Sequence, residues 1–232
     1  MSYLNIQGLQ KLTLLDYPNH TACTIFLGGC DLCCPFCHNA PLIQPTSSGT
    51  ITPSELFEFL KKRQGLLDGV CISGGEPLLH ADLDTLLTEI RNMGYLIKLD
   101  TNGTHPDHLN SLLSKSLLDY VAMDIKNSPS KYAQTVGKTS FNPAPITESI
   151  HILHSASISF EFRTTVVQEF HEISDFVQIG QWIQGAPYYY IQSFVDRNGV
   201  PTSNLHPYDK ETLLQCADTV RPYVQHVELR GI

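Results

Sequence analysis

The stretch Ala22-Cys23-Thr24-Ile25-Phe26-Leu27-Gly28-Gly29 is a short apolar run that ends in two glycines. An uncharged run of this length, bounded by glycine, is typical of a strand that is buried on both faces. Strands of this kind occur in parallel sheets whose faces are covered by helices. The stretch therefore predicts an α/β protein built on a parallel sheet.

Further strand-like runs alternate with helical patterns along the chain. Strands are predicted at 69–72, 95–100, 119–124, 159–167, 188–194 and 226–230. Helices are predicted after the capping box Thr52-Pro53-Ser54-Glu55 and at about 81–94, 106–116, 146–154, 174–184 and 209–220. This alternation favours right-handed crossovers between parallel strands. A closed barrel takes about 250 residues, so we predict an open, partial (β/α)6 barrel with parallel strands, in a single domain over residues 1–232.

The composition excludes several functional classes. The 232 residues are 42% hydrophobic and 16% charged, which is ordinary for a globular protein. No apolar run reaches the roughly 20 residues of a membrane helix, and the first residues do not resemble a secretory signal. The net charge of −8 argues against a nucleic-acid groove, which needs a basic surplus. We therefore expect a soluble cytoplasmic protein with no nucleic-acid and no membrane partner.

Cysteine is the most informative residue type. There are seven cysteines, an odd number, and a cytoplasmic chain favours metal or redox chemistry over disulfides. Four lie within eight residues: Cys30, Cys33, Cys34 and Cys37. The other three are scattered, as core thiols are: Cys23, Cys71 and Cys216.

Without Cys33, the clustered cysteines have the spacing C-x3-C-x2-C, at Cys30, Cys34 and Cys37. Three thiolates at this spacing can bind one face of a metal cluster and leave one iron open. The alternative is a zinc site with Cys33 or His38 as its fourth ligand, although zinc ribbons supply two separated ligand pairs and no second pair follows. Cys33 is adjacent to Cys34 and cannot easily point the same way, so we leave it out of the ligand set.

Polar residues follow the predicted strands, at the carboxyl ends where α/β proteins carry their functional groups. After the cysteines these are Ser73–Pro77, Asp100–Gly103, Met123–Lys126, Arg163 and Gln192. We expect them to surround a single opening at the carboxyl ends of the strands. Taken alone, Gly74-Gly75 is typical of a tight turn, and Lys126 equally fits a solvated charge.

The chain resembles the radical S-adenosylmethionine superfamily over most of its length. The resemblance rests on the cysteine spacing with Phe36 before the last cysteine, and on Gly74-Gly75-Glu76-Pro77 one strand later. Cys34-Pro35-Phe36-Cys37-His38-Asn39 is similar to the glycyl-radical-enzyme activases. The lead-in Gly8–Pro18 and the closing Val227–Gly231 are similar to the activating proteins of anaerobic ribonucleoside-triphosphate reductase.

The resemblance implies an iron–sulfur enzyme. Cys30, Cys34 and Cys37 would hold a 4Fe–4S cluster, and S-adenosylmethionine would be cleaved reductively to a 5′-deoxyadenosyl radical. That radical would generate a glycyl radical on a partner, expected to be anaerobic ribonucleoside-triphosphate reductase. A low-potential electron donor and an oxygen-poor, reducing cytoplasm are implied as well.

The resemblance also implies which residues bind the cosubstrate. Gly74 and Gly75 would let the backbone approach the methionine moiety, and Glu76 would accept from its ammonium group. Phe36 would lie against the adenine, with ordinary core packing as the alternative. His38 fits a hydrogen-bonding role better than ligation.

Two further groups of residues are carried over from the family. Lys126 and Arg163 would face the anionic end of the cosubstrate, and Gln192 stands where some activases carry a histidine. In the related pyruvate formate-lyase activases, carboxylates help to hold a monovalent cation beside the methionine carboxylate. The corresponding positions are Asp100, Thr101, Met123 (through its carbonyl) and Asp124.

Alternative interpretations remain. A superfamily member that acts on a small molecule, such as a deazaguanine synthase, would need a closed pocket and resembles this chain less in Cys37-His38-Asn39. A non-catalytic zinc module is disfavoured by Gly74–Pro77. Residues 127–145, with their Gly, Ser, Asn and Pro, predict a mobile surface loop, of which 127–142 is expected to order with a ligand or partner. Four histidines show no ligand grouping: His105, His108, His151 and His154.

Overall fold

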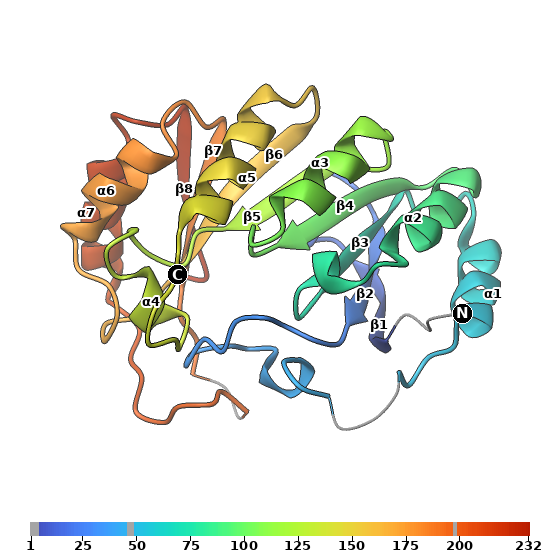
Figure 1. Cartoon of the computed structure of the whole chain (residues 1–232), viewed down its shortest axis with the longest axis horizontal. Coiled ribbons are helices and arrows are strands. Elements are labelled where there is room, and N and C mark those ends of the chain that lie inside the picture. Colours follow the sequence, from blue (N-terminus) through green and yellow to red (C-terminus); the bar gives the residue numbers. More distant parts are fainter. Residues whose placement is uncertain (1–4, 46–48, 197–198) are drawn as a thin grey trace. The chain divides into compact units, whose positions relative to one another are not determined.

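The computed structural model describes residues 5–45, 49–196 and 199–232 (Figure 1). Its contacts divide the chain into two compact units. The first contains the residues up to Asp31, Pro41–Thr101 and Asp107–Val121, and the second contains Leu32–Ala40, Asn102–Pro106 and Ala122–Ile232. Both units are discontinuous in sequence, and the single domain expected over residues 1–232 stays a prediction.

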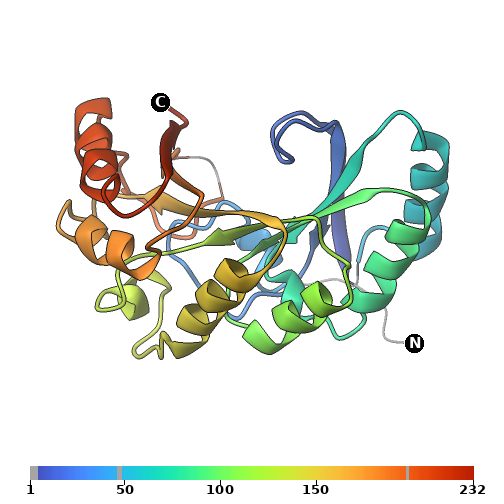
Figure 2. The same cartoon turned by 90° about the horizontal axis from the view of Figure 1, so that it is seen from above.

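The first unit carries the opening strands of the chain. These are β1 (Ile6–Thr13), β2 (Ala22–Leu27), β3 (Gly69–Gly74) and β4 (Leu96–Thr101). Its helices are α1 (Pro53–Arg63), α2 (Leu83–Asn92) and most of α3 (Pro106–Ser114), with single 3-10 turns at η1 (Ala40–Leu42) and η2 (Pro77–Leu79). β3 pairs in parallel with both β2 and β4. The helices lie on one side of these strands (Figure 2).

Local sequence explains the first elements. β2 is the apolar run quoted above, and Ala22, Cys23, Ile25 and Leu27 are fully buried in it. α1 begins at the predicted capping box. The Thr52 hydroxyl accepts from the Glu55 N–H at 3.2 Å, and the Glu55 carboxylate accepts from the Thr52 N–H at 2.8 Å. Such a cap stabilises a helix by about 1 kcal/mol.

β1 was not predicted, and it changes the expectation that the strands are all parallel. It pairs with β2 in antiparallel fashion, with Leu9 opposite Ile25 and a register irregularity between Gln10 and Thr13. Only its end residues, Ile6 and Thr13, are buried. Its other residues are half-buried or exposed and include Gln10 and Lys11, so its sequence shows neither a continuous apolar run nor a strict alternation. The parallel strands are therefore flanked by one antiparallel edge strand.

The second unit carries the end of β5 (Tyr120–Asp124), whose first two residues belong to the first unit. Its other strands are β6 (Ser159–Val166), β7 (Tyr188–Ser193) and β8 (His226–Arg230). Its helices are α4 (Tyr132–Thr135), α5 (Ala144–Ser155), α6 (Asp175–Trp182) and α7 (Lys210–Val220). β7 pairs in parallel with both β6 and β8.

Across the described residues, the strands form one eight-stranded sheet in the order β1 to β8. The order ends at β1 and β8 without closing, which confirms the predicted open α/β partial barrel. None of the helices in the described ranges is both long and apolar enough to cross a membrane.

The expectation of a surface loop at 127–145 was wrong for its first half. Asn127, Ser128, Tyr132 and Thr135 are fully buried, and Tyr132 begins α4. The polar residues that suggested a loop are bonded internally instead: the Asn127 amide donates to the Thr135 hydroxyl at 2.9 Å. Buried polar groups that find such partners are tolerated inside a protein.

Candidate functional site

In the first unit, the predicted Gly74-Gly75-Glu76 turn lies directly against the backbone that leads to Cys30. The Gly75 N–H donates to the Leu27 carbonyl at 2.9 Å, and the Glu76 N–H donates to the Gly29 carbonyl at 2.7 Å. A Cβ at Gly75 would lie 2.0 Å from the Gly29 oxygen. The turn and the end of β2 therefore approach too closely for any residue but glycine.

Gly74 has a second reason to be glycine. Its φ is +125°, a conformation that residues with a Cβ rarely adopt, and a Cβ there would lie 2.2 Å from the Leu27 oxygen. The two glycines taken alone predict a tight turn, and the family resemblance implies a close approach of a ligand. The structure shows that contact with β2 already requires them, whatever else the turn binds.

Glu76 is fully buried and is held by its own unit. Its carboxylate accepts from the Leu78 N–H at 3.0 Å and from the Thr101 hydroxyl at 2.9 Å. Thr101 is the last residue of β4 and is also buried. Two residues that were predicted from different strand ends are therefore in direct contact.

Asp100 is paired with a lysine that sequence reasoning missed. The Lys98 ammonium lies 2.5 Å from the Asp100 carboxylate, and only 1% of Lys98 is exposed. The Lys98 ammonium also lies 5.9 Å from the centre of the Tyr120 ring. Because strand residues alternate between faces, Lys98 and Asp100 share one face, which was the available signal for this pair.

We expect Lys98→Met to lower the free energy of unfolding by about 2 kcal/mol, because it leaves the Asp100 carboxylate without its ammonium partner in a largely buried place. The double variant Lys98→Met/Asp100→Asn should recover at least half of that loss. Urea unfolding of the two variants measures both values. Additive effects of the two substitutions would show that the pair is not coupled.

In the second unit, Asp124 joins two predicted cationic residues. Its carboxylate is bonded at one oxygen by Arg163 Nε at 2.9 Å and at the other by Lys126 Nζ at 2.8 Å. Burial favours the neutral acid, but the two positive charges outweigh it and hold the pKa of Asp124 well below its usual range. The three groups therefore carry a net charge of +1, from two cations and one carboxylate.

The charge of Lys126 also acts on the cysteines of its unit. Burial lowers the pKa of Lys126, and the Asp124 charge together with the thiols of Cys34 and Cys37 raises it further than burial lowers it. Burial in turn raises the pKa of Cys37, which the Lys126 charge opposes. An ammonium group close to two thiols favours their thiolate form, the form that binds metal.

The cysteine segment of the second unit is held through its backbone. The Cys33 N–H donates to the Val136 carbonyl at 3.1 Å, and the Cys37 N–H donates to the Cys34 carbonyl at 3.1 Å. Cys34 is buried, whereas the Cys33 side chain is exposed. Neighbouring residues thus differ in environment, as expected when only one of them is a ligand.

Phe36 and His38 are both packed within the second unit. The Phe36 ring lies 5.6 Å from the Phe170 ring and 6.3 Å from the His171 ring, so core packing accounts for its burial. His38 Nε2 lies 2.8 Å from the Val195 carbonyl, and its ring stacks on Phe194 at 5.5 Å. The contact with the Val195 carbonyl is a hydrogen bond, the kind of role expected for His38.

The remaining predicted positions lie at strand ends of the second unit. Gln192 is half-buried in β7, opposite Thr165 of β6 and Arg230 of β8. Met123 is fully buried, and a Cβ at Gly103 would lie 2.1 Å from its terminal methyl carbon. The close fit fixes the Met123 side chain beside Gly103.

The seven cysteines, all within the described ranges, are thiols rather than disulfides. Cys30 belongs to the first unit, and Cys34 and Cys37 belong to the second. Within the part of the chain that the structure describes, no three His, Cys, Asp or Glu side chains are gathered as metal ligands. The donor set itself, three reduced thiols at C-x3-C-x2-C spacing, fits an iron–sulfur cluster.

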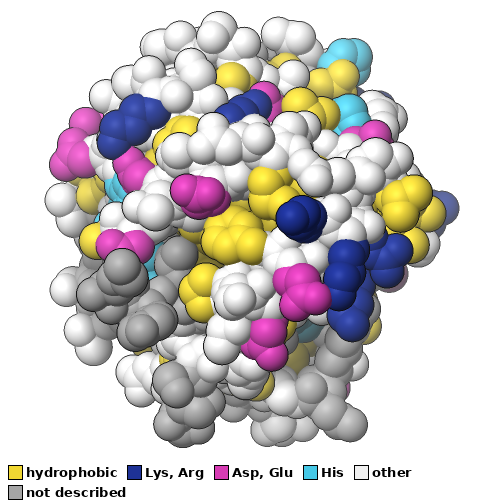
Figure 3. Space-filling view, turned by 90° about the vertical axis from the view of Figure 1, so that its right-hand side faces the viewer, with side chains coloured by type: hydrophobic (Ala, Val, Ile, Leu, Met, Phe, Trp, Pro, Cys, Tyr) yellow, Lys and Arg dark blue, Asp and Glu magenta, His cyan; other side chains and the backbone are white. Residues whose placement is uncertain are grey.

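The first unit also contains a groove of about 450 Å³ between β1 and α1, lined by Leu9, Lys11, Ile51, Phe59 and Lys62 among others. Figure 3 shows the side that carries α1, where hydrophobic side chains are bordered by charged ones. Its lining comes from β1, α1 and the residues just before α1, not from the strand ends where the predicted site residues lie.

Comparison with known proteins finds relatives of the chain. A provisionally named glycyl-radical enzyme activating enzyme of Methanocaldococcus jannaschii is 31% identical over 238 residues, covering 98% of this chain and 96% of that protein. A 7-carboxy-7-deazaguanine synthase of Methanothermobacter thermautotrophicus is 33% identical over 102 residues, covering 42% of this chain and 38% of that protein.

The fold is found among solved structures as well. Streptococcus suis SuiB bound to S-adenosylmethionine superposes with a TM-score of 0.68 at 16% identity, over 87% of this chain. The chain spans about half of SuiB, 48% of its length. The family model of the Radical SAM superfamily matches residues 24–183. Family membership implies a 4Fe–4S cluster and S-adenosylmethionine. By its motif, its fold and its full-length relative, the chain belongs to the radical SAM superfamily.

Proposed function

We propose that this chain is a glycyl-radical-enzyme activating enzyme whose partner is anaerobic ribonucleoside-triphosphate reductase. The observation that carries the proposal is the similarity to the Methanocaldococcus jannaschii protein along nearly the whole of both chains. The lead-in Gly8–Pro18 and the closing Val227–Gly231 supply the choice of partner. A low-potential electron donor and a reducing, oxygen-poor cytoplasm belong to the same proposal.

In this proposal Cys30, Cys34 and Cys37 hold the cluster, and Cys33 does not. Held there, a 4Fe–4S cluster would supply the electron for reductive cleavage of S-adenosylmethionine, and the resulting 5′-deoxyadenosyl radical would take a hydrogen atom from a glycine of the partner. Cys34 is buried, which would shield a ligand bond from water, and the Lys126 charge favours the thiolate form of Cys37.

The remaining residues bind and orient the cosubstrate. The net positive group formed by Asp124, Lys126 and Arg163 attracts the methionine carboxylate. On the first unit, the turn at Gly74-Gly75-Glu76 presents backbone and a buried carboxylate to the methionine ammonium group. Phe36 and Gln192 are proposed to contact the adenosine part.

The proposal includes a monovalent cation beside the cosubstrate. Of its proposed ligands, Asp100 is bonded by Lys98 and Asp124 is bonded by Lys126 and Arg163. A cation at Asp100, Thr101, Met123 and Asp124 would therefore compete with ammonium groups that the chain itself provides. Measuring cosubstrate affinity in sodium, potassium and tetramethylammonium salts tests this part, and identical affinities would contradict it.

The test of the function uses the full chain, reconstituted anaerobically with iron and sulfide and then reduced. With S-adenosylmethionine and purified anaerobic ribonucleoside-triphosphate reductase, we expect one 5′-deoxyadenosine for each glycyl radical detected by EPR. Pyruvate formate-lyase serves as the mismatched partner and should remain without a radical. Radical formation on pyruvate formate-lyase alone would overturn the choice of partner.

A small-molecule substrate is the second candidate, favoured by the similarity to the deazaguanine synthase. That similarity covers only 42% of this chain, less than half of the coverage of the activase-like relative. In the same assay, a small-molecule enzyme would form 5′-deoxyadenosine without a radical on either protein. A colourless chain that binds one zinc ion would contradict both candidates.

A further inference from the structure

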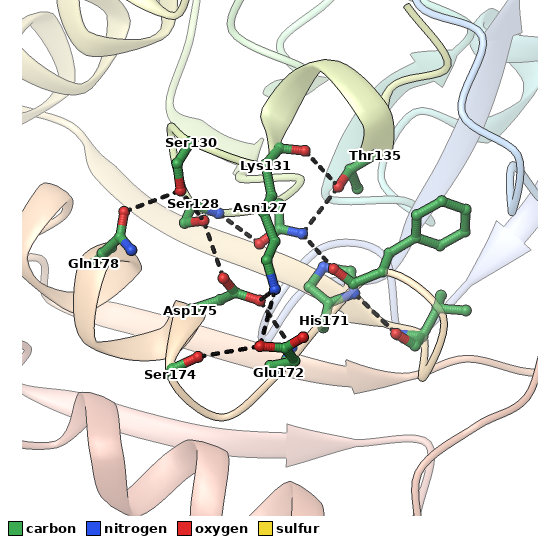
Figure 4. Close-up of polar contacts among 12 residues, drawn as sticks. Asn127, Ser128, Ser130, Lys131, Thr135, His171, Glu172, Ser174, Asp175 and Gln178 are labelled. Carbon is green, nitrogen blue, oxygen red and sulfur yellow. Dashed lines mark hydrogen bonds and ion pairs between the residues drawn. The ribbon is translucent and has the colours of Figure 1, made fainter.

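A buried polar network in the second unit joins the segment after β5 to the segment after β6 (Figure 4). Asn127 is its centre on one side: its amide donates to the Thr135 hydroxyl at 2.9 Å and to the Phe170 carbonyl at 2.8 Å. The Ser128 hydroxyl donates to the Asp175 carboxylate at 3.2 Å. Asn127, Ser128, Thr135 and Asp175 are buried, so the bonds among them are made out of reach of water.

Lys131 closes the same network from the side of α4. Its ammonium lies 2.9 Å from the Asp175 carboxylate and 3.3 Å from that of Glu172 (Figure 4). Asp175 also accepts from the Glu172 N–H at 2.8 Å. The start of α6 and the segment that carries α4 are therefore fixed to one another by charged as well as neutral bonds.

His171 lies beside this network, is also fully buried, and contacts Lys126 of the candidate site. Its Nε2 lies 2.8 Å from the Lys126 carbonyl, which can only accept, so Nε2 donates. Its Nδ1 lies 3.2 Å from both the N–H and the carbonyl oxygen of Val167. Burial lowers the pKa of His171, which favours the neutral ring, and the neutral ring accepts from the Val167 N–H while it donates to Lys126. One ring thus ties the end of β6 to the backbone of Lys126.

The two joined segments are also the ones that contact the cysteine segment. The Phe36 ring lies against Phe170 and the edge of His171. Cys33 donates to the Val136 carbonyl, and a Cβ at Gly137 would lie 2.2 Å from the Cys33 oxygen. Any shift of either segment would therefore be transmitted to the residues on both sides of Cys34.

We propose that His171 is a positioning residue of the iron–sulfur site, which holds the backbone of Lys126 and the ring of Phe36 in place and thereby fixes Cys34. That this site binds an iron–sulfur cluster rests on the proposed function, whereas the contacts of His171 do not. His171 acts through Lys126 and Phe36 and does not bind the cluster itself. No sequence motif marks it, because it lies eight residues beyond Arg163 in an irregular segment.

The first test needs no cofactor. In the iron-free full chain, the rate of iodoacetamide labelling at Cys34 is compared by mass spectrometry with that at Cys216, a fully buried thiol of the same unit. His171→Phe keeps a ring beside Phe36 but removes both hydrogen bonds. We expect it to raise the labelling ratio of Cys34 to Cys216 by about tenfold or more, because local opening exposes Cys34.

His171→Gln and Tyr95→Phe complete the set. Gln can still donate to the Lys126 carbonyl, so its ratio should stay within about threefold of wild type. Tyr95→Phe removes a buried hydrogen bond to the Leu60 carbonyl in the first unit and should leave the ratio unchanged. Equal rises at Cys34 and Cys216 in His171→Phe would mean global loosening and would overturn the proposal, as would a failure of Gln to restore protection.

The second test uses the iron-loaded, reduced chain. We expect His171→Phe to raise the S-adenosylmethionine concentration that half-saturates the cosubstrate-dependent EPR change by about tenfold, as loss of a group that orients a metal site does. Tyr95→Phe should match wild type. If no cluster forms in any variant, the proposed function fails while the labelling result still decides the role of His171. An unchanged half-saturation in His171→Phe would contradict the positioning role.

Discussion

Replacing Cys30, Cys34 or Cys37 by Ala is expected to abolish iron binding and, with it, all cleavage of S-adenosylmethionine. A cluster held by three thiolates has no spare protein ligand, so each loss should cost more than the roughly 10- to 100-fold that loss of a hydrogen-bond partner of a ligand costs. Iron content after anaerobic reconstitution and the yield of 5′-deoxyadenosine measure the effect. Thermal unfolding of the iron-free variants should remain close to that of wild type.

Cys33→Ala is the matched control, because it removes a neighbouring thiol from the same segment. The Cys33 side chain is exposed, and what the fold uses is its backbone N–H, which Ala retains. Iron content and cleavage should therefore stay within about twofold of wild type, as for a surface substitution. Loss of iron in Cys33→Ala together with its retention in Cys30→Ala would show that the ligand set is a different one.

The parallel strands were predictable because burial on both faces leaves an uninterrupted apolar run, as in β2. β1 was not, because an edge strand with exposed residues in its centre carries no such run. The segment after β5 was wrongly predicted as a surface loop, because its polar residues are buried. Asn127 and Ser128 belong to residue types that usually mark loops, yet here they are buried and bonded to Thr135 and Asp175. Such pairings join positions far apart in sequence, and a local pattern cannot reveal them.

Functional groups were predicted at the carboxyl ends of the parallel strands, and the structure shows contacts within two sets of these residues. Glu76 meets Thr101 in the first unit, and Asp124 meets Lys126 and Arg163 in the second. Lys98 and His171 were missed, because one lies inside a strand and the other in an irregular segment. Lys98 is paired with the predicted residue Asp100, and His171 is hydrogen-bonded to the backbone of the predicted residue Lys126. The i, i+2 spacing of Lys98 and Asp100 on one strand was an available signal, whereas the partners of His171 come together only through tertiary packing.

Gly75→Ala is expected to cause the second large effect, because the added methyl group would lie 2.0 Å from the Gly29 carbonyl oxygen. That oxygen is part of the backbone and cannot move aside without breaking its bond to the Glu76 N–H. We expect the free energy of unfolding to fall by about 3 kcal/mol or more, and the half-saturating S-adenosylmethionine concentration to rise. Urea unfolding and the EPR titration measure the two effects.

Gly94→Ala separates a steric effect from a conformational one. Gly94 also lies in the first unit, at a φ of +89°, but a Cβ there would meet no atom within 4 Å. Only backbone strain of about 1–2 kcal/mol should follow, with no change in the titration. If Gly75→Ala unfolds no more easily than Gly94→Ala, then the turn can retreat from β2, and contact with β2 is not what requires glycine at Gly75. The requirement would then have to come from a bound ligand, as the resemblance to the radical S-adenosylmethionine superfamily implies.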